Sequence, residues 1–350
     1  MRENIIFASG DFPLFGGAAT NVYALTKWLN SKENFKAITV INYSLKLTLD
    51  KLDPHDTGCV YHIQDWKQEN IKSDIITLLE GEPNIIYIKK WIVGHYLKLL
   101  FPKTKIIYIL SSVISSEYVW TNKDASSLYT EEIMPKCIRD LTFTDKIIAN
   151  SKISQEILLN FNKNTNVDIA YTSFIINDEK KYSFLKLNNI IDENWNNRKY
   201  DIGFSSSCCN REIKNIKLFI DIITNQQFIN KKKIIIGKNS EQYNNIEKCT
   251  CFEFLHHDDL MEQIKNTKLI IITSHYESLS NFMIEAINYG CNILISHTIG
   301  GNEFIINECI ANTYFEFLEK TSKLLEKQVN CLKSDFNYSE DKLMRDLFLN

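Results

Sequence analysis

The chain has 350 residues, about twice the usual size of one domain, so we expect two domains. Its 40 lysines and arginines are balanced by 43 aspartates and glutamates. This balance excludes a surface built to neutralise a phosphate backbone, and we expect no nucleic-acid partner. The longest apolar runs fall far short of the ~20 residues that span a bilayer, and no secretory signal is visible, so a cytoplasmic location is expected.

The first half of the sequence alternates apolar runs with amphipathic stretches. Runs rich in Ile, Val, Phe and Tyr are expected to form strands at residues 4–8, 37–41, 85–88, 106–110 and 146–149. This alternation is typical of βαβ units around a parallel sheet.

A glycine-rich turn follows the first expected strand. Gly16 and Gly17 open an amphipathic stretch that runs through Leu29. Glycine lets the backbone approach a ligand closely, and the N-terminus of the following helix favours an anion. A tight turn with no ligand is the alternative for this segment taken alone. The turn is not a G-x-G-x-x-G motif, and the chain has no P-loop motif, so neither a dinucleotide-binding dehydrogenase nor a P-loop NTPase is expected.

A basic region lies in the same half of the chain. Its members are Lys89, Lys90, Lys98, Lys103 and Lys105. Either they form a solvated face, or they contact a lipid-linked or phosphorylated acceptor, which would imply peripheral contact with a membrane.

The strand pattern restarts after an irregular polar stretch from about residue 173 to residue 199. Strands are expected at residues 201–205, 233–236, 252–255, 269–273 and 292–295. We therefore expect an α/β protein of two doubly wound, Rossmann-like domains, residues 1–172 and 173–337, with a junction near Tyr171. In open α/β sheets, ligands lie outside the carboxyl ends of the strands, so functional residues are expected in the turns there.

Two cations follow the strand expected at residues 201–205. Arg211 and Lys214 precede an amphipathic helix that begins near Ile216. A guanidinium and an ammonium at such a turn can neutralise a diphosphate and stabilise it as it departs. A solvated helix start is the alternative for these two residues taken alone.

Two glutamates separated by seven residues follow the strand expected at residues 269–273. With a helix that begins near Ser280 or Asn281, Glu277 lies in the loop before it and Glu285 lies just over one turn inside it. A loop carboxylate can accept hydrogen bonds from sugar hydroxyls, and a helical one can hold a ribose diol. The helix N-terminus can receive phosphate. Two glutamates at this spacing often occur by chance. Their position after a buried strand is what makes them candidates for a binding site.

A metal site has little support in the sequence. His256, His257, Asp258 and Asp259 are consecutive, and consecutive side chains on an extended segment diverge. Asp258 is instead expected to cap the N-terminus of the next helix.

These segments together resemble the family 4 retaining glycosyltransferases, or glycosyl transferases group 1, which have the GT-B fold of two Rossmann-like domains facing each other across a cleft. The resemblance covers essentially the whole chain. The matching landmarks, in chain order, are Gly16-Gly17, Ile147-Ile148-Ala149-Asn150-Ser151, Arg211-x-x-Lys214-Asn215, Ile235-Ile236-Gly237, Glu277-x7-Glu285-Ala286, Gly290-Cys291-Asn292-Ile293 and Gly300-Gly301-Asn302-Glu303. The family also implies that residues 338–350 return to the first domain as a helix, for which Ser339 is a suitable N-cap.

The resemblance implies a role for each part of the site. Arg211, Lys214 and Glu277 would carry catalysis: the two cations hold the donor diphosphate, and Glu277 holds the hydroxyls of the transferred sugar. Glu285 would bind the ribose hydroxyls. The remaining donor contacts would come from the backbone of Ser280, Asn281 and Phe282 at the phosphates, and from Gly16 and Gly17 in the other domain.

The implied activity is transfer of a hexose-type sugar, with retention, from a nucleotide-diphosphate sugar to a glycan, lipid-linked or protein acceptor. The donor would be a UDP- or GDP-sugar. No cofactor or metal is implied, since the chain also lacks the D-x-D triplet by which GT-A glycosyltransferases hold a divalent metal. Ser111-Ser112 stands where many members have a His-Gly pair. This departure motivates the alternative of a catalytically weakened GT-B protein that binds a nucleotide sugar or a partner without transfer. A nucleotide-sugar epimerase of the same fold is a further alternative.

Overall fold

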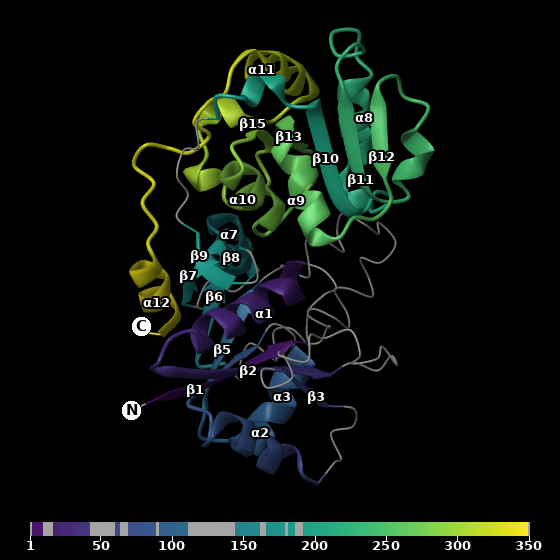
Figure 1. Ribbon diagram of the computed structural model, residues 1–350. Helices are drawn as coiled ribbons and strands as arrows, with labels where there is room; N and C mark the ends of the chain where they lie inside the picture. Colours follow the sequence, from purple (N-terminus) through teal and green to yellow (C-terminus); the bar gives the residue numbers. More distant parts are fainter. Residues whose placement is uncertain are drawn as a thin grey trace.

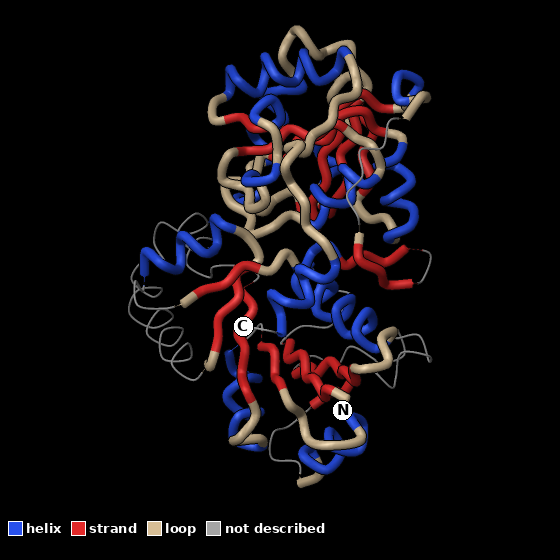
Figure 2. The backbone as a smooth tube through the Cα atoms, turned by 90° about the vertical axis from the view of Figure 1, so that its left-hand side faces the viewer, coloured by secondary structure: helices blue, strands red, loops and turns tan. Residues whose placement is uncertain are grey.

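Two α/β bodies, one above the other, make up the computed structural model of the chain (Figure 1). The structure describes residues 2–9, 17–42, 60–63, 69–88, 91–110, 144–161, 166–178, 181–185 and 192–348. A view turned by 90° shows the strands of the two bodies as separate groups (Figure 2).

The first sheet has seven parallel strands in the order β3-β2-β1-β4-β5-β6-β7. Alternate residues of β1 face opposite sides, because Ile5 and Ile6 belong to different core clusters and both are fully buried. The strands are β1 (Glu3–Ser9), β2 (Phe35–Asn42), β3 (Val60–Ile63), β4 (Ile85–Ile88), β5 (Lys105–Leu110), β6 (Lys146–Ala149) and β7 (Val167–Ile169). The helices among the described residues of this part are α1 (Gly17–Asn30), α2 (Ile71–Leu79), α3 (Trp91–Leu100) and α7 (Lys152–Phe161).

The second sheet has six parallel strands in the order β12-β11-β10-β13-β14-β15. In both sheets the order reverses between the first and fourth strands, as in doubly wound folds. The strands are β10 (Tyr200–Cys208), β11 (Lys233–Lys238), β12 (Cys249–Phe252), β13 (Thr267–Ile272), β14 (Asn292–Ser296) and β15 (Ile310–Ala311). Its α-helices are α8 (Ile216–Ile223), α9 (His257–Lys265), α10 (Asn281–Asn288) and α11 (Tyr314–Glu326).

Two local predictions for the second domain are wrong. The strand expected at residues 252–255 is β12 (Cys249–Phe252), whose four residues pair with Lys233–Ile236 of β11, so that residues 253–255 lie beyond its end. Phe254, beyond that end, is 75% exposed. The next helix begins at His257 with His256 as its N-cap, so Asp258 lies inside the first turn instead of capping it. A carboxylate there still interacts favourably with the helix dipole.

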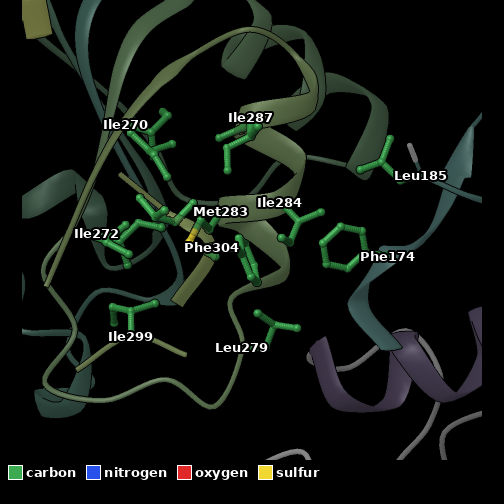
Figure 3. Close-up of a cluster of buried hydrophobic side chains, with 14 of the residues drawn as sticks. Phe174, Leu185, Ile270, Ile272, Leu279, Met283, Ile284, Ile287, Ile299 and Phe304 are labelled. Carbon is green, nitrogen blue, oxygen red and sulfur yellow. The ribbon is translucent and has the colours of Figure 1, made fainter. Parts of the chain in front are cut away.

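The segment expected to be irregular from residue 173 contains a β-hairpin. Its strands, β8 (Ile175–Asp178) and β9 (Lys181–Phe184), are antiparallel. The hairpin packs against α1, while Phe174 at its start lies beside Ile284 of α10 (Figure 3). The segment therefore contacts both bodies, and the division after residue 172 stays a prediction.

The last helix, α12 (Glu340–Phe348), lies beside the first body in Figure 1. Ser339 caps it, because its hydroxyl accepts a hydrogen bond from the Lys342 backbone N–H at 3.1 Å. Glu340 accepts a hydrogen bond from Trp28 Nε1 at 3.1 Å and pairs with Lys32 at 2.5 Å. These contacts fix the end of the chain to the first domain. Among the described residues, no helix is both long and apolar enough to cross a membrane.

The buried hydroxyl of Thr321, on α11, gives a stability prediction. Thr321 is fully buried, and its Oγ1 has no hydrogen-bond partner among the residues that the structure describes. Since a buried hydroxyl without a partner costs about 1–3 kcal/mol, we expect Thr321→Val, which keeps the side-chain shape, to raise Tm by about 2–4 °C. Calorimetric unfolding checks this; a lower Tm would mean that the hydroxyl is bonded in solution.

Candidate functional site

The candidate site lies where the strand order of the second sheet reverses. Strands β10 and β13 are hydrogen-bonded neighbours, and their connections leave in opposite directions toward β11 and β14. The turns that follow the two strands therefore open at the same point, which is where ligands bind in doubly wound folds. Lys214 follows β10, and Glu277 follows β13.

Lys214 and Glu277 form an ion pair in this position. The Lys214 Nζ donates to Glu277 Oε1 at 2.8 Å, and the two side chains are only 20% and 16% exposed. The Ser274 hydroxyl donates to the same carboxylate oxygen at 2.7 Å. Ser274 was not predicted as a site residue; its one signal in the sequence is its place just after the strand.

Hydrogen bonds to two backbone carbonyls hold the two turns together. The Thr273 hydroxyl donates to the Asn215 carbonyl at 2.9 Å, and the His275 N–H donates to the Ile213 carbonyl at 2.8 Å. Asn215 has φ 48°, in the left-handed region that asparagine tolerates, and its side chain caps α8 by accepting from the Leu218 N–H. The ion pair is therefore preorganised by the backbone on both sides.

The Glu277 carboxyl is held in its ionised form. Burial opposes ionisation, but the Lys214 ammonium and hydrogen bonds from Lys214, Ser274 and Ser280 outweigh it and hold the pKa of Glu277 below its usual range. An ionised carboxylate only accepts hydrogen bonds. At neutral pH, Glu277 is thus suited to receive hydroxyl donors.

The N-terminus of α10 lies directly after this loop. Ser280 is its N-cap, with a hydroxyl that accepts from the Met283 N–H at 3.2 Å. Helix α10 begins at Asn281, as predicted, and packs one face into the core through Met283, Ile284 and Ile287 (Figure 3). The positive end of its dipole favours an anion beside Glu277 and Lys214.

Glu285 lies on a polar stripe of α10, away from that core face. Asn281, Glu285 and Asn288 recur at helical spacing and are all half-buried. Burial raises the pKa of Glu285 to about 7. No charged partner offsets this burial among the residues that the structure describes. A half-buried carboxylate in this state is ready for hydrogen-bond donors from a ligand.

The structure gives the positions of some of the other predicted site residues but does not describe all of them. Arg211 is exposed, three residues before Lys214 on the same turn, and Asn281 and Phe282 form the first turn of α10. Gly17 begins α1, whereas Gly16 and the pair Ser111-Ser112 lie outside the described residues.

No metal-ligand set is found in the part of the chain that the structure describes: nowhere do three His, Cys, Asp or Glu side chains gather as ligands would. The described cysteines are free thiols.

Comparisons with known proteins agree with this architecture. Residues 188–338 match the family model described as Glycosyl transferases group 1. None of the curated proteins matches the chain.

Solved structures resemble the chain over nearly its whole length. Sucrose-phosphate synthase from Thermosynechococcus elongatus has a TM-score of 0.68 at 14% identity, with 93% of this chain and 90% of that one covered. WaaG, a glycosyltransferase involved in lipopolysaccharide biosynthesis, has a TM-score of 0.59 at 11% identity, covering 92% and 90%. An alpha-glucosyltransferase in complex with UDP and a 13-mer DNA also has a TM-score of 0.59 at 11% identity, covering 98% and 92%. Likenesses at such low identity show the fold, which is GT-B, as the sequence predicts.

Proposed function

We propose that the chain is a glycosyltransferase that transfers a sugar, with retention, from a nucleotide-diphosphate sugar. The match of residues 188–338 to the family model of the glycosyl transferases group 1 supports this proposal. The observation that carries this proposal is the Lys214–Glu277 pair at the reversal point of the second sheet, beside the N-terminus of α10. The pair offers a cation for the diphosphate and a carboxylate for the sugar within one preorganised turn. The acceptor would be a glycan, a lipid-linked molecule or a protein, and the protein would act in the cytoplasm.

The proposed chemistry depends on charge that develops during the reaction. As the glycosidic bond breaks, negative charge grows on the departing diphosphate, and Lys214, Arg211 and the N–H groups at the start of α10 would stabilise it. Glu277, ionised at neutral pH, would accept hydrogen bonds from the sugar hydroxyls and orient the sugar. Glu285 would accept from the ribose diol. Gly16 and Gly17 would approach the donor from the first domain. The arrangement needs no metal, which we propose as a property of the enzyme.

The choice between UDP and GDP as the donor nucleotide rests on similarity to a solved structure. A structure with a similar fold was solved in complex with UDP, which supports UDP as the first nucleotide to test, with GDP as the second.

The exposed face of α3 supports a lipid-linked acceptor. Leu99 is 66% exposed and Tyr96 is 40% exposed. Lys98 lies between them in the sequence and Lys103 follows the helix. The Lys98 ammonium donates to the Thr104 carbonyl at 3.0 Å, so the exposed apolar side chains are the main support, and they suit the surface of a membrane. Lys89 and Lys90 of the same predicted region lie outside the described residues.

The test is release of nucleoside diphosphate from a panel of UDP- and GDP-sugars, with and without glycan, lipid-linked and peptide acceptors. We expect release that requires one donor and one acceptor class and persists in EDTA. Loss of activity in EDTA with recovery in Mn²⁺ would contradict the metal-independent mechanism. UDP or GDP binding without release from any donor would favour the non-catalytic alternative, and an isomerised donor sugar without acceptor would favour an epimerase.

A further inference from the structure

A buried polar cluster joins the two domains next to Glu277. The first domain contributes Asn150, Ser151 and Ser154, from the end of β6 and the start of α7; the second contributes Tyr276 and Ser278, the two neighbours of Glu277 in the chain. All of these side chains are buried. We call these five residues the boundary cluster.

The hydrogen bonds of the boundary cluster form one directed chain across the boundary. The Ser151 hydroxyl donates to Ser154 Oγ at 3.1 Å, and Ser154 Oγ donates to Ser278 Oγ at 3.0 Å. Ser278 in turn donates to Asn150 Oδ1. The Tyr276 hydroxyl lies 3.1 Å from Ser154 Oγ, so it can serve as a second donor to Ser154. Ser154 Oγ also lies 3.4 Å from Asn150 Oδ1. Because each hydroxyl has one proton to give, the order in which Ser154 donates to the nearer Ser278 uses each proton once.

Glu303 makes a second contact across the same boundary. Its Oε1 accepts from the Lys152 N–H, at the start of α7, at 2.8 Å and from the Tyr171 hydroxyl at 3.1 Å. Its Oε2 accepts from the Gly301 N–H at 2.9 Å. A carboxylate of the second domain therefore satisfies an end N–H of a first-domain helix and favours its positive dipole end.

Gly300 lies between the Glu277 loop and the residues that make the boundary cluster and the Glu303 contact. Its N–H donates to the Glu277 carbonyl at 2.7 Å. A Cβ at Gly300 would lie 1.6 Å from the Ser278 carbonyl oxygen and 2.5 Å from Ser151 Oγ, so no other residue fits without displacing backbone. The Glu277 loop is thus held between the Gly300 backbone and the start of α7.

We propose that the boundary cluster is a latch: Ser278 and its first-domain partners Asn150 and Ser154 are positioning residues that set the place of the Glu277 carboxylate. Both chain neighbours of Glu277 bond to the first domain, so its position follows the seating of one domain on the other. This inference rests on the proposed function, in which Glu277 orients the transferred sugar.

The latch predicts that turnover suffers more than nucleotide binding. In Ser278→Ala, Asn150 Oδ1 and Ser154 Oγ lose the hydroxyl that they share, and Tyr276 is left as the one residue of the Glu277 loop that bonds to the first domain within the boundary cluster. Displacing a group that orients the sugar is expected to lower kcat by about 10-fold to 10²-fold. The Kd for UDP or GDP, which lack the sugar, should stay within about twofold.

The experiment compares Ser278→Ala with wild type and with Thr321→Val, a control that removes a buried second-domain hydroxyl away from the boundary. Amide hydrogen exchange is measured on peptides covering residues 150–161 and 274–303, together with kcat and the Kd for UDP and GDP. We expect faster exchange on both sides of the boundary, lower kcat and unchanged Kd in Ser278→Ala alone. If Ser278→Ala does not fold, Ser154→Ala breaks the same chain from the first domain.

Unchanged exchange of residues 150–161 would overturn the latch, as would normal kcat in an active variant or an equal loss of kcat and nucleotide affinity. The amide hydrogen exchange measurement does not require the enzyme to turn over. Suppose that wild type turns over no donor, but Ser278→Ala still speeds amide exchange on both sides of the boundary. That result would reject the proposed function and would still support the coupling of the Glu277 loop to the first domain.

Discussion

Replacing Lys214 with alanine is expected to lower kcat by about 10²-fold or more, with a smaller change in the Kd for the donor. Lys214 is the partly buried cation of the site, 2.8 Å from Glu277, and its charge matters most when the diphosphate departs. Arg211→Ala, on the same turn, is expected to act in the same direction. Single-turnover kinetics with direct nucleotide binding separate the two quantities.

A matched control lies three residues beyond Lys214. Lys217 is 84% exposed and pairs with Asp221 on the surface of α8, so Lys217→Ala should turn over like wild type. Because Lys214→Ala also leaves Glu277 without its cation, the double variant Lys214→Ala with Glu277→Gln tests whether the loss comes from the missing cation or the orphaned carboxylate. Normal turnover in both Lys214→Ala and Arg211→Ala would place the phosphate site elsewhere.

Glu285→Ala is expected to weaken nucleoside diphosphate binding by about 1.5–3 kcal/mol, the value of hydrogen bonds to a charged group. The pKa of Glu285 is raised to about 7 by burial, and ribose hydroxyls donate to its ionised form. Affinity for UDP or GDP should therefore fall as pH drops from 8 to 6 in wild type. The nucleotide phosphate also titrates in this range, but it does so equally in Glu285→Gln. The difference between the two pH profiles by calorimetry isolates the carboxylate.

The same shift predicts a stability change of defined sign. A carboxyl whose folded pKa is raised favours the folded state while it is protonated. Its contribution is present below the unfolded pKa and is lost as pH rises through about 7. Without ligand, Glu285→Gln should be more stable than wild type at pH 8, by up to about 3 kcal/mol, and similar to it at pH 4. Glu262→Gln, an exposed glutamate of α9, is the control. Equal pH profiles of stability for all three proteins would contradict the raised pKa of Glu285.

Local rules account for what the sequence could predict. The apolar runs locate most strands of both sheets, because a strand buried on both faces must be apolar over its length. Ser339 is an N-cap as predicted, and the helix expected to begin near Ser280 or Asn281 does so, with Ser280 as its N-cap, since a cap bonds only to N–H groups two or three residues ahead. The placement of Glu277 in a loop and Glu285 within α10 follows from that one cap.

The sequence alone does not predict short strands whose position depends on the strand that pairs with them. The short β12 pairs with β11 through Cys249–Phe252, earlier in the chain than predicted, and the hairpin of β8 and β9 has only four-residue strands in a polar stretch. Such segments have too little apolar periodicity to reveal themselves, and they form because a neighbour supplies the missing hydrogen bonds.

The amino-acid sequence by itself determined that this protein has two doubly wound domains and which turns carry its charged residues. The tertiary structure decided that Lys214 meets Glu277, 63 residues away in the chain, and that Ser278 meets Asn150, 128 residues away. It also decided the ionisation of the two glutamates. The Glu277 carboxyl is held ionised with the help of the Lys214 ammonium, whereas Glu285, buried without a cation, has a raised pKa. The physical reason is range: periodicity and capping act over a few residues, whereas sheet order and burial exist only once distant segments have packed together.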